Sequence, residues 1–174
     1  KTYQEIRHKF PHLHIILAGY FECYGGNLQT VLSLPVQTIH LDLVRCPSQL
    51  DDILATDFVK TKTNLSLGVV DGRNVWKNDF QQSLSLIDKA VKKTGAGRIW
   101  IAPSCSLLHS PCDLDLETND KALTPEIKQW LAFARQKIDE VVTLKQLANK
   151  ENTEAVNKKW QENLAANQSR RTST

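Results

Sequence analysis

Four short apolar runs alternate with helical patterns along this chain, and that alternation limits its possible folds more than any other feature. The runs cover residues 13–18, 38–44, 64–70 and 98–102. They recur at intervals of roughly 25 to 33 residues, the size of a unit made of one parallel strand and its following helix. Parallel strands are covered on both faces and are therefore apolar throughout, as these runs are. The sequence predicts an α/β fold built from parallel βα repeats.

The segments between the runs carry helix signals. One stripe at helical spacing ends at Gly95 and consists of Phe80, Leu84, Ile87 and Val91. A longer stripe follows the helix-start signal Thr124-Pro125-Glu126 and predicts one amphipathic helix with Ile127, Trp130, Leu131, Ala134, Ile138, Val141 and Val142 on its apolar face. A polar tail helix containing Val156, Trp160 and Leu164 is expected after it.

Four βα units do not close a barrel, because an eight-unit barrel of the TIM type takes about 250 residues. We therefore predict half of a TIM-type (βα)8 barrel over residues 1–148, followed by a C-terminal helical extension and the start of an interdomain linker over residues 149–174. The first and last strands would leave unpaired edges, and apolar side chains lining the barrel would lose their opposite wall: Ile15, Leu17, Ile39, Leu41, Val69 and Ile99. Both features predict self-association, or association with the missing half.

Composition excludes several functional classes. The 174 residues are 41% hydrophobic and 24% charged, which suits one globular domain. The net charge of +3 is dispersed, so we expect no nucleic-acid partner, and no apolar run approaches the roughly 20 residues of a membrane span. Nothing points to secretion, so the four cysteines are expected to be reduced in a cytoplasmic protein. The absence of methionine suggests a piece cut from a longer chain.

Polar side chains follow the last two runs. Asp71, Arg73 and Asn74 come after the third run, and the fourth leads to Ser104, Ser106 and His109. Because the carboxyl ends of parallel strands meet at one edge of a sheet, we expect these residues to form a common ligand-binding or domain-interface rim. Arg73 could bind a carboxylate in a bidentate manner, which would suit an anion-binding module. The alternative is structural, with Asp71 and Arg73 forming a salt bridge that ties adjacent loops together.

Two further possibilities involve the cysteines of the fourth loop. Cys105, His109 and Cys112 could hold zinc if Asp113, His40 or Cys23 supplied a fourth ligand. Cys105 and His109 could also act as a nucleophile pair in a self-sufficient enzyme. The more ordinary interpretation makes Cys105 a small apolar filler at a strand end. His40 and Asp42, two positions apart on one strand, share a face and could form an internal hydrogen bond, for which a structural role is the more ordinary interpretation.

Two motifs resemble a known family. The sequence Ser-Cys-Ser-Leu-Leu-His-Ser-Pro at residues 104–111 is similar to the end of the amino-terminal barrel of cobalamin-independent methionine synthase. Residues 67–76, Leu-Gly-Val-Val-Asp-Gly-Arg-Asn-Val-Trp, resemble the preceding strand and loop of that family. The resemblance continues, in the family's order, through residues 20–21, 40–44 and 170–174. It covers nearly the whole chain and corresponds to the second half of the barrel.

The resemblance implies a methyltransferase that moves a methyl group from 5-methyltetrahydrofolate polyglutamate to homocysteine. In that family the catalytic zinc is held by His, Cys, Glu and Cys of a carboxyl-terminal barrel, and none of that barrel is present here. The segment is then expected to be a scaffold on the folate side, without a catalytic residue, metal or cofactor of its own, and inactive alone. Its partners would be the remaining domains of the same enzyme, the folate and homocysteine.

Overall fold

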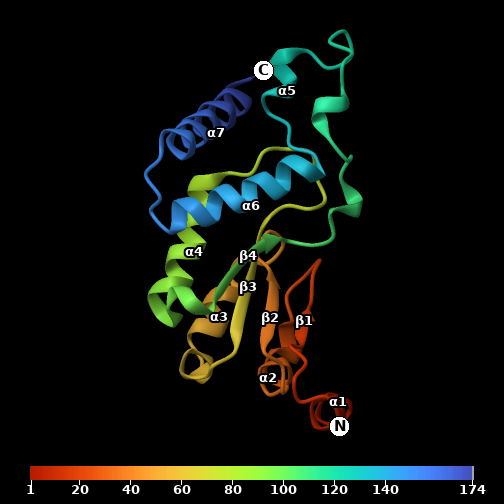
Figure 1. The fold of residues 1–174 in the computed structure, drawn as a ribbon, viewed down its shortest axis with the longest axis vertical. Helices are drawn as coiled ribbons and strands as arrows, with labels where there is room; N and C mark the ends of the chain where they lie inside the picture. Colours follow the sequence, from red (N-terminus) through yellow and green to blue (C-terminus); the bar gives the residue numbers. More distant parts are fainter. Residues whose placement is uncertain (174) are drawn as a thin grey trace.

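The computed structural model describes residues 1–173, and its centre is a four-stranded sheet (Figure 1). The strands lie in chain order: β1 (Ile16–Ala18), β2 (Thr38–Asp42), β3 (Asn64–Val70) and β4 (Ile99–Pro103). All three neighbouring pairs are parallel. The predicted α/β class with parallel strands is therefore confirmed, and β1 and β4 form the two edges of the sheet.

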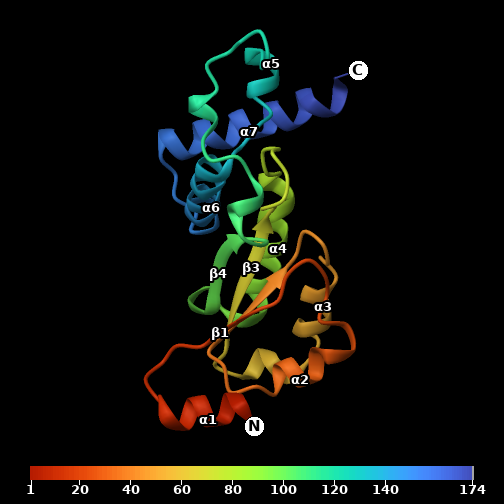
Figure 2. The ribbon, with the colours of Figure 1, turned by 90° about the vertical axis from the view of Figure 1, so that its right-hand side faces the viewer.

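The α-helices of residues 1–173 are α1 (Thr2–Lys9), α2 (Leu28–Leu32), α3 (Gln49–Leu54), α4 (Phe80–Thr94), α5 (Pro125–Lys128), α6 (Ala134–Ala148) and α7 (Glu154–Thr172). Short 3-10 helices cover Gly25–Asn27, Asp57–Lys60, Ala96–Arg98, Leu107–His109 and Leu114–Leu116. Figures 1 and 2 place α1 at one end of the molecule and α5 and α7 at the other. None of the helices in the described part of the chain is long and apolar enough to cross a membrane.

Local hydrogen bonds and backbone geometry fix several of these boundaries. The Asp42 carboxylate accepts hydrogen bonds from the backbone N–H groups of Val44 (3.1 Å) and Arg45 (2.9 Å). These bonds turn the chain, so β2 ends at Asp42 rather than at Val44. Asp79 caps α4 because its carboxylate accepts a hydrogen bond from the Gln82 N–H at 3.0 Å. At the other end of α4, Gly95 has φ +85°, a conformation that glycine adopts without a steric penalty.

The two faces of the sheet differ in polarity, because successive side chains of a strand point to opposite faces. One face forms the apolar core, in which Ile39, Leu41 and Leu65 pack with helix residues such as Leu50 and Ile87. The opposite face carries polar side chains that are also buried, namely Thr38, His40, Asp42 and Ser66. The helices therefore cover the apolar face, and the polar face lies on the opposite side of the sheet.

The polar face overturns the prediction that apolar side chains line the inside of the sheet. The residues expected there lie instead in, or packed against, the helix-covered core: Ile15, Leu17, Ile39, Leu41, Val69 and Ile99. On the polar face, His14 Nε2 lies 2.8 Å from Thr38 Oγ1, and the His14 ring stacks on Trp100 with centroids 5.3 Å apart. Since His14 precedes β1 and Trp100 belongs to β4, this contact curves the sheet around its polar face.

The single long helix predicted after Thr124 is also wrong. The chain forms the four-residue helix α5, a turn at residues 129–130 and a bridging residue, Leu131, before α6 begins. Two backbone hydrogen bonds of 2.8 Å join this segment to residues 75–77, and they use the Trp130 C=O and the Ala132 N–H, which a continuous helix would need. The buried face of α6 carries Lys137, Glu140, Thr143 and Leu144, whereas Ile138 and Val142 of the predicted apolar stripe are 54% and 49% exposed.

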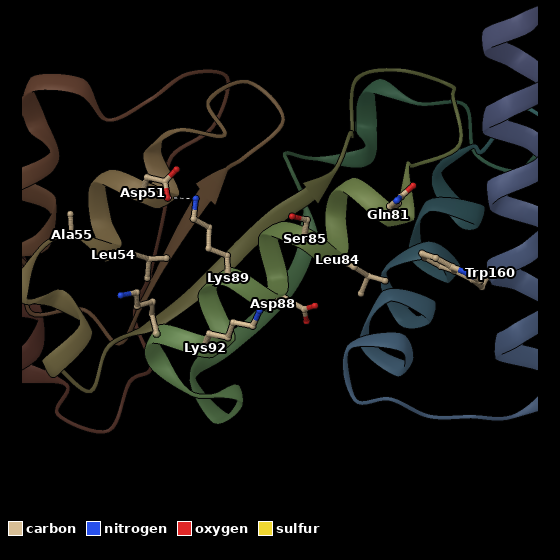
Figure 3. A pocket seen from close by; sticks show the side chains of 11 residues that line it. Asp51, Leu54, Ala55, Gln81, Leu84, Ser85, Asp88, Lys89, Lys92 and Trp160 are labelled. Carbon is tan, nitrogen blue, oxygen red and sulfur yellow. Dashed lines mark ion pairs between the residues drawn. The ribbon is translucent and has the colours of Figure 1, made fainter.

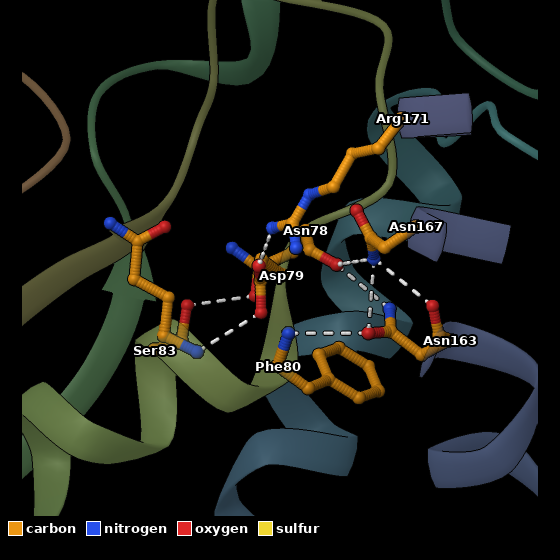
Figure 4. Close-up of polar contacts among 8 residues, drawn as sticks. Asn78, Asp79, Phe80, Ser83, Asn163, Asn167 and Arg171 are labelled. Carbon is orange, nitrogen blue, oxygen red and sulfur yellow. Dashed lines mark hydrogen bonds and ion pairs between the residues drawn. The ribbon is translucent and has the colours of Figure 1, made fainter. Parts of the chain in front are cut away.

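The tail helix α7 packs against α4 and α6 and is held by a polar network (Figure 4). The side-chain amides of Asn163 and Asn167 donate hydrogen bonds to the backbone oxygen of Asn78 at 2.8 and 3.0 Å. Arg171 forms an ion pair with Asp79 at 2.5 Å. The carboxyl-terminal helix is thus attached to the loop that leads from β3 to α4.

The prediction of four reduced cysteines is wrong for one pair. Cys23 and Cys46 form a disulfide, with their Cα atoms 5.4 Å apart. They meet because their loops follow the adjacent parallel strands β1 and β2. Cys105 is free and buried, and Cys112 is free and exposed.

Candidate functional site

The loops that follow the four strands gather at one edge of the sheet, because all four strands are parallel. We call this group of loops the rim. It consists of residues 19–24 after β1, 42–46 after β2, 71–74 after β3 and 104–110 after β4. Every residue that the sequence suggested for ligand binding lies in the last two of these loops.

The loops after β3 and β4 are bonded to each other. The Gly72 N–H donates to Ser104 Oγ at 3.2 Å, and the Ser110 hydroxyl donates to the carbonyl oxygens of Gly72 (3.2 Å) and Asn74 (3.1 Å). A side chain at Gly72 would lie 2.9 Å from the carbonyl oxygen and sulfur of Cys105, so glycine permits the close approach. The expected proximity of the Asp71 and Ser104 loops is therefore present in the structure.

Asp71 and Asn74 hold their own loop. The Asp71 carboxylate accepts from the Arg73 backbone N–H (2.8 Å) and from the Asn74 side-chain amide (2.7 Å). Among residues 1–173, no ion pair joins Asp71 to the Arg73 guanidinium, so the structural alternative of an interloop salt bridge is wrong. The Asn74 amide oxygen accepts from Trp76 N–H (3.1 Å) and from Lys137 Nζ (3.2 Å), so both of its lone pairs are used.

Lys137 and Glu140 bring two ionisable groups beneath this loop from α6. Lys137 is fully buried and donates to the carbonyl oxygen of Trp76 at 3.1 Å. Burial lowers the pKa of its ammonium group. One carboxylate oxygen of Glu140 accepts from the Asn78 N–H at 2.8 Å, and the other is buried without a partner. Burial raises the pKa of Glu140 to about 7.

Phe21 contacts each of the other three loops of the rim. Its N–H donates to the Asp42 carboxylate at 2.8 Å. The Arg73 guanidinium lies over its ring, 4.6 Å from the centroid, and the His109 ring meets it edge-on at 5.8 Å. Phe21 also has φ +80°, which non-glycine residues rarely adopt. Phe21 therefore joins the loops after β2, β3 and β4, the first through its backbone N–H and the other two through its ring.

Three of the predicted polar residues present side chains to solvent. Arg73, Ser106 and His109 are exposed, whereas Ser104 is buried. The Ser106 hydroxyl accepts a hydrogen bond from the Leu108 N–H at 3.3 Å and caps the following turn. The loops after β3 and β4 thus expose a guanidinium over the Phe21 ring, an imidazole that meets this ring edge-on, and the Ser106 hydroxyl.

The cysteines of the fourth loop do not converge with His109. Cys105 is buried against Gly72, its sulfur lies 3.6 Å from the Ser106 carbonyl oxygen, and burial raises the pKa of its thiol. A raised pKa opposes formation of the nucleophilic thiolate. Within residues 1–173, no three His, Cys, Asp or Glu side chains are arranged to hold a metal ion. Cys105, His109 and Cys112 therefore fit neither a zinc site nor a Cys–His nucleophile pair.

His40 and Asp42 do not form the hydrogen bond that their shared face would allow. His40 Nδ1 lies 2.9 Å from Ser66 Oγ, and its Nε2 lies 3.1 Å from the Ser104 carbonyl oxygen. The Asp42 carboxylate is instead used by backbone N–H groups, including that of Phe21. His40 thus ties β2 to β3 and to the loop after β4 on the polar face, which is a structural role.

Hollows also occur next to the rim and away from it. One of about 280 Å³ lies behind the loop after β3 and is lined by residues that include Asp71, Asn74, Lys77 and Arg170. Figure 3 shows a groove of about 890 Å³ between α3, α4 and Trp160 of α7, where Lys89 pairs with Asp51. The charges in this groove are mixed, and it contains no rim residue. It does not select one class of ligand.

Sequence reasoning missed the residues that organise the rim. Phe21 carries no polar group, and Lys137 stood in a segment interpreted as an ordinary amphipathic helix. Their partners are 21 to 88 positions away, a separation that local patterns do not report. The sequence did contain a signal for the burial of Lys137. It lies three residues after Ala134 and four before Val141, and therefore on the same face of the predicted helix as these apolar residues.

Comparison with known proteins identifies the family. The family described as "Cobalamin-independent synthase, N-terminal domain" matches residues 1–95. A 5-methyltetrahydropteroyltriglutamate--homocysteine methyltransferase from Flavobacterium johnsoniae is 62% identical over 173 residues, covering 99% of this chain and 22% of that protein. A protein of the same name from Cytophaga hutchinsonii is 60% identical over 84% of this chain, which is 19% of its own length. Another, from Saccharomyces cerevisiae, is 48% identical over 75% of this chain, which is 16% of its own length.

The chain spans about a fifth of the length of the curated relatives it matches. The alignment with the first relative covers 173 of the 174 residues and therefore includes the loops of the rim. Because the family match covers residues 1–95 of 174, this chain belongs to the cobalamin-independent synthase N-terminal domain family.

Proposed function

We propose that this chain is a segment of a methyltransferase that transfers a methyl group from a 5-methyltetrahydrofolate polyglutamate to homocysteine and so makes methionine. The support comes from relatives that carry the name of this activity and align with up to 99% of the chain. The residues of the segment suit a scaffold with a ligand-facing rim. We propose a cytoplasmic location for the whole protein.

The proposal includes a half-barrel architecture. Four parallel strands in chain order, curved around a polar concave face, suit half of a TIM-type barrel over residues 1–148. The boundary at residue 148 coincides with the end of α6, and the extension beyond it contains α7. β1 and β4 then present edges to which strands from the rest of the protein, or a second copy of this chain, would pair.

Arg73 is the residue of the rim that we assign to the folate side. Its guanidinium is exposed, is held over the Phe21 ring, and makes no ion pair within the described residues. A planar guanidinium with free N–H groups binds carboxylates in a bidentate manner. This free, preoriented cation is the observation that carries the assignment, and the glutamate tail of the substrate supplies carboxylates.

The zinc that the resemblance implies is assigned to a part of the protein outside this chain. Cys105 is buried, Cys112 is exposed, and the two do not converge with His109, so these donors do not fit a zinc site. When bound elsewhere, zinc would activate the homocysteine thiol by lowering its pKa. The residues of this chain would position the folate and support that site.

Replacing Arg73 by alanine in the full-length protein is expected to weaken binding of the triglutamate substrate about tenfold, because one charge-assisted contact is lost. Isothermal titration calorimetry checks this. Arg73→Lys should bind more tightly than Arg73→Ala, since lysine keeps the positive charge but lacks the planar guanidinium that binds a carboxylate through two hydrogen bonds. Lys93→Ala removes an exposed cation of α4 as the control and should leave binding unchanged. Unaltered affinity in Arg73→Ala would contradict the assignment of Arg73.

A further inference from the structure

The disulfide lies close to the residue that organises the rim. Cys23 follows Phe21 by two positions, and Cys46 follows Asp42, the hydrogen-bond partner of Phe21, by four. Cys23 is exposed, whereas Cys46 is only 4% exposed. The covalent bond therefore joins the loop that carries Phe21 to the loop that carries its backbone anchor, and one of its sulfur atoms belongs to a residue accessible from solvent.

Phe21 is held in place by few restraints. The hydrogen bond to Asp42 fixes its N–H, and Tyr24 anchors the far side of the loop through Gln49 Oε1 (2.5 Å) and the His40 carbonyl oxygen (3.0 Å). Its left-handed backbone conformation is disfavoured for a residue with a side chain. The disulfide is the covalent restraint on this loop. Without it, the loop is free to relax towards an ordinary conformation.

We propose that Cys23 and Cys46 form a reversible thiol–disulfide site that sets the position of Phe21 and, through its ring, the orientation of the Arg73 guanidinium. In the oxidised chain the ring supports Arg73 at 4.6 Å and meets His109. In the reduced chain the loop after β1 relaxes, and the ring leaves both partners. In a cytoplasmic protein such a disulfide is transient and redox-sensing rather than permanent.

The reaction partner is a thiol–disulfide couple such as glutathione. A glutathione thiolate attacks the sulfur of the exposed Cys23, a mixed disulfide forms, and the Cys46 thiolate leaves and takes a proton from water. The Ser48 hydroxyl, 3.7 Å from the Cys46 sulfur, can donate a hydrogen bond to that thiolate. A second glutathione thiolate attacks the glutathione sulfur of the mixed disulfide and releases Cys23. Two protein thiols and one glutathione disulfide result, and the reverse reaction oxidises the pair.

The proposal is tested on the 174-residue chain equilibrated in glutathione buffers. Alkylation after denaturation, read by mass, is expected to show two free thiols in the oxidised chain and four in the reduced chain. NMR of the Arg73 side-chain Nε–Hε group reports the aromatic ring beneath it. We expect reduction to move its chemical shift to the value of an arginine that has no aromatic ring beneath it. The Cys23→Ser/Cys46→Ser variant should show that chemical shift under all conditions.

Two control variants separate this effect from general ones. Cys105→Ser/Cys112→Ser removes the free cysteines and should keep the redox response of the Arg73 signal. Phe21→Leu removes the ring and should abolish that response. An Arg73 signal that is the same in the oxidised and reduced chains would overturn the inference, as would a pair that stays reduced in glutathione disulfide.

A binding measurement tests whether the disulfide also affects the function proposed above. Only this measurement rests on that proposed function. Triglutamate binding to the full-length protein is expected to be about two- to fivefold weaker after reduction, since the aromatic support of Arg73 is lost. Equal affinity in both states would count against control of Arg73 by the pair. Absence of triglutamate binding in both states would count against the ligand role of Arg73, while the NMR signal would still decide the redox inference.

Discussion

Replacing Gly68 by alanine is expected to lower the free energy of unfolding by about 3 kcal/mol, because the added methyl group overpacks a rigid part of the sheet. Its Cβ would lie 2.6 Å from the Leu41 carbonyl oxygen, 2.7 Å from Ser104 Cα and 2.9 Å from a ring carbon of His40. The first two are backbone atoms, so β2 or the loop after β4 would have to move. Urea unfolding measures the change.

Gly97→Ala is the matched control, since a Cβ at that position would meet no atom within 4 Å. Its stability should stay within about 0.5 kcal/mol of the unmodified chain. Gly68→Ala should also disturb the rim, because Ser104 supports the Gly72 N–H. Equal stability of the two variants would show that β2 and the Ser104 loop leave room for a methyl group at position 68.

Glu140 is expected to make the stability of the chain fall as the pH rises. Its folded pKa is about 7, whereas an unfolded glutamate titrates near 4.3. Between these values the unfolded chain releases its proton first, so the stabilisation present at low pH is lost as the pH rises through about 7. The difference corresponds to about 4 kcal/mol, an order-of-magnitude value for a buried carboxyl group.

Glu140→Gln removes this dependence and keeps an oxygen to accept the Asn78 hydrogen bond. Unfolding in urea at pH 5 and pH 8 should show the unmodified chain losing about 2 to 3 kcal/mol more than the variant. Glu162→Gln changes an exposed carboxylate of α7, with 58% of its side chain exposed, and should behave like the unmodified chain. If the free energy of unfolding depended on pH in the same way in all three proteins, ionisation of the buried Glu140 carboxyl group would not destabilise the fold, and the prediction would be wrong.

The strands were the most predictable part of the fold. The bounds of β3 agree with the apolar run at residues 64–70, whereas β1 and β2 are shorter than their runs and β4 is shifted by one residue. The shortening of β2 follows from the hydrogen bonds of the Asp42 carboxylate, which the run does not encode. Apolar residues alternate with polar ones in Thr38-Ile-His-Leu-Asp, which signals two faces of different chemistry. Treating the run as apolar throughout concealed the buried polar face that His40 and Ser66 form.

The site was predictable in its position but not in its organisation. The polar residues after β3 and β4 lie together as expected, because parallel topology alone brings them to one edge. The roles of Asp71 and Asn74 within their own loop depend on exact turn geometry, and that of Lys137 depends on a helix 61 positions beyond Trp76. The disulfide required knowing that the loops after β1 and β2 approach each other.

The central claim, that this chain is a working segment of a methyltransferase, is tested most directly by exchange with a relative. The matching segment of the Flavobacterium johnsoniae protein, 62% identical over 173 residues, would be replaced by this chain. Methyl transfer from the triglutamate folate to homocysteine would then be measured. We expect the chimera to keep its activity within about tenfold of the parent, and its Arg73→Ala variant to lose affinity for the folate. A folded chimera without methyl transfer would contradict the claim.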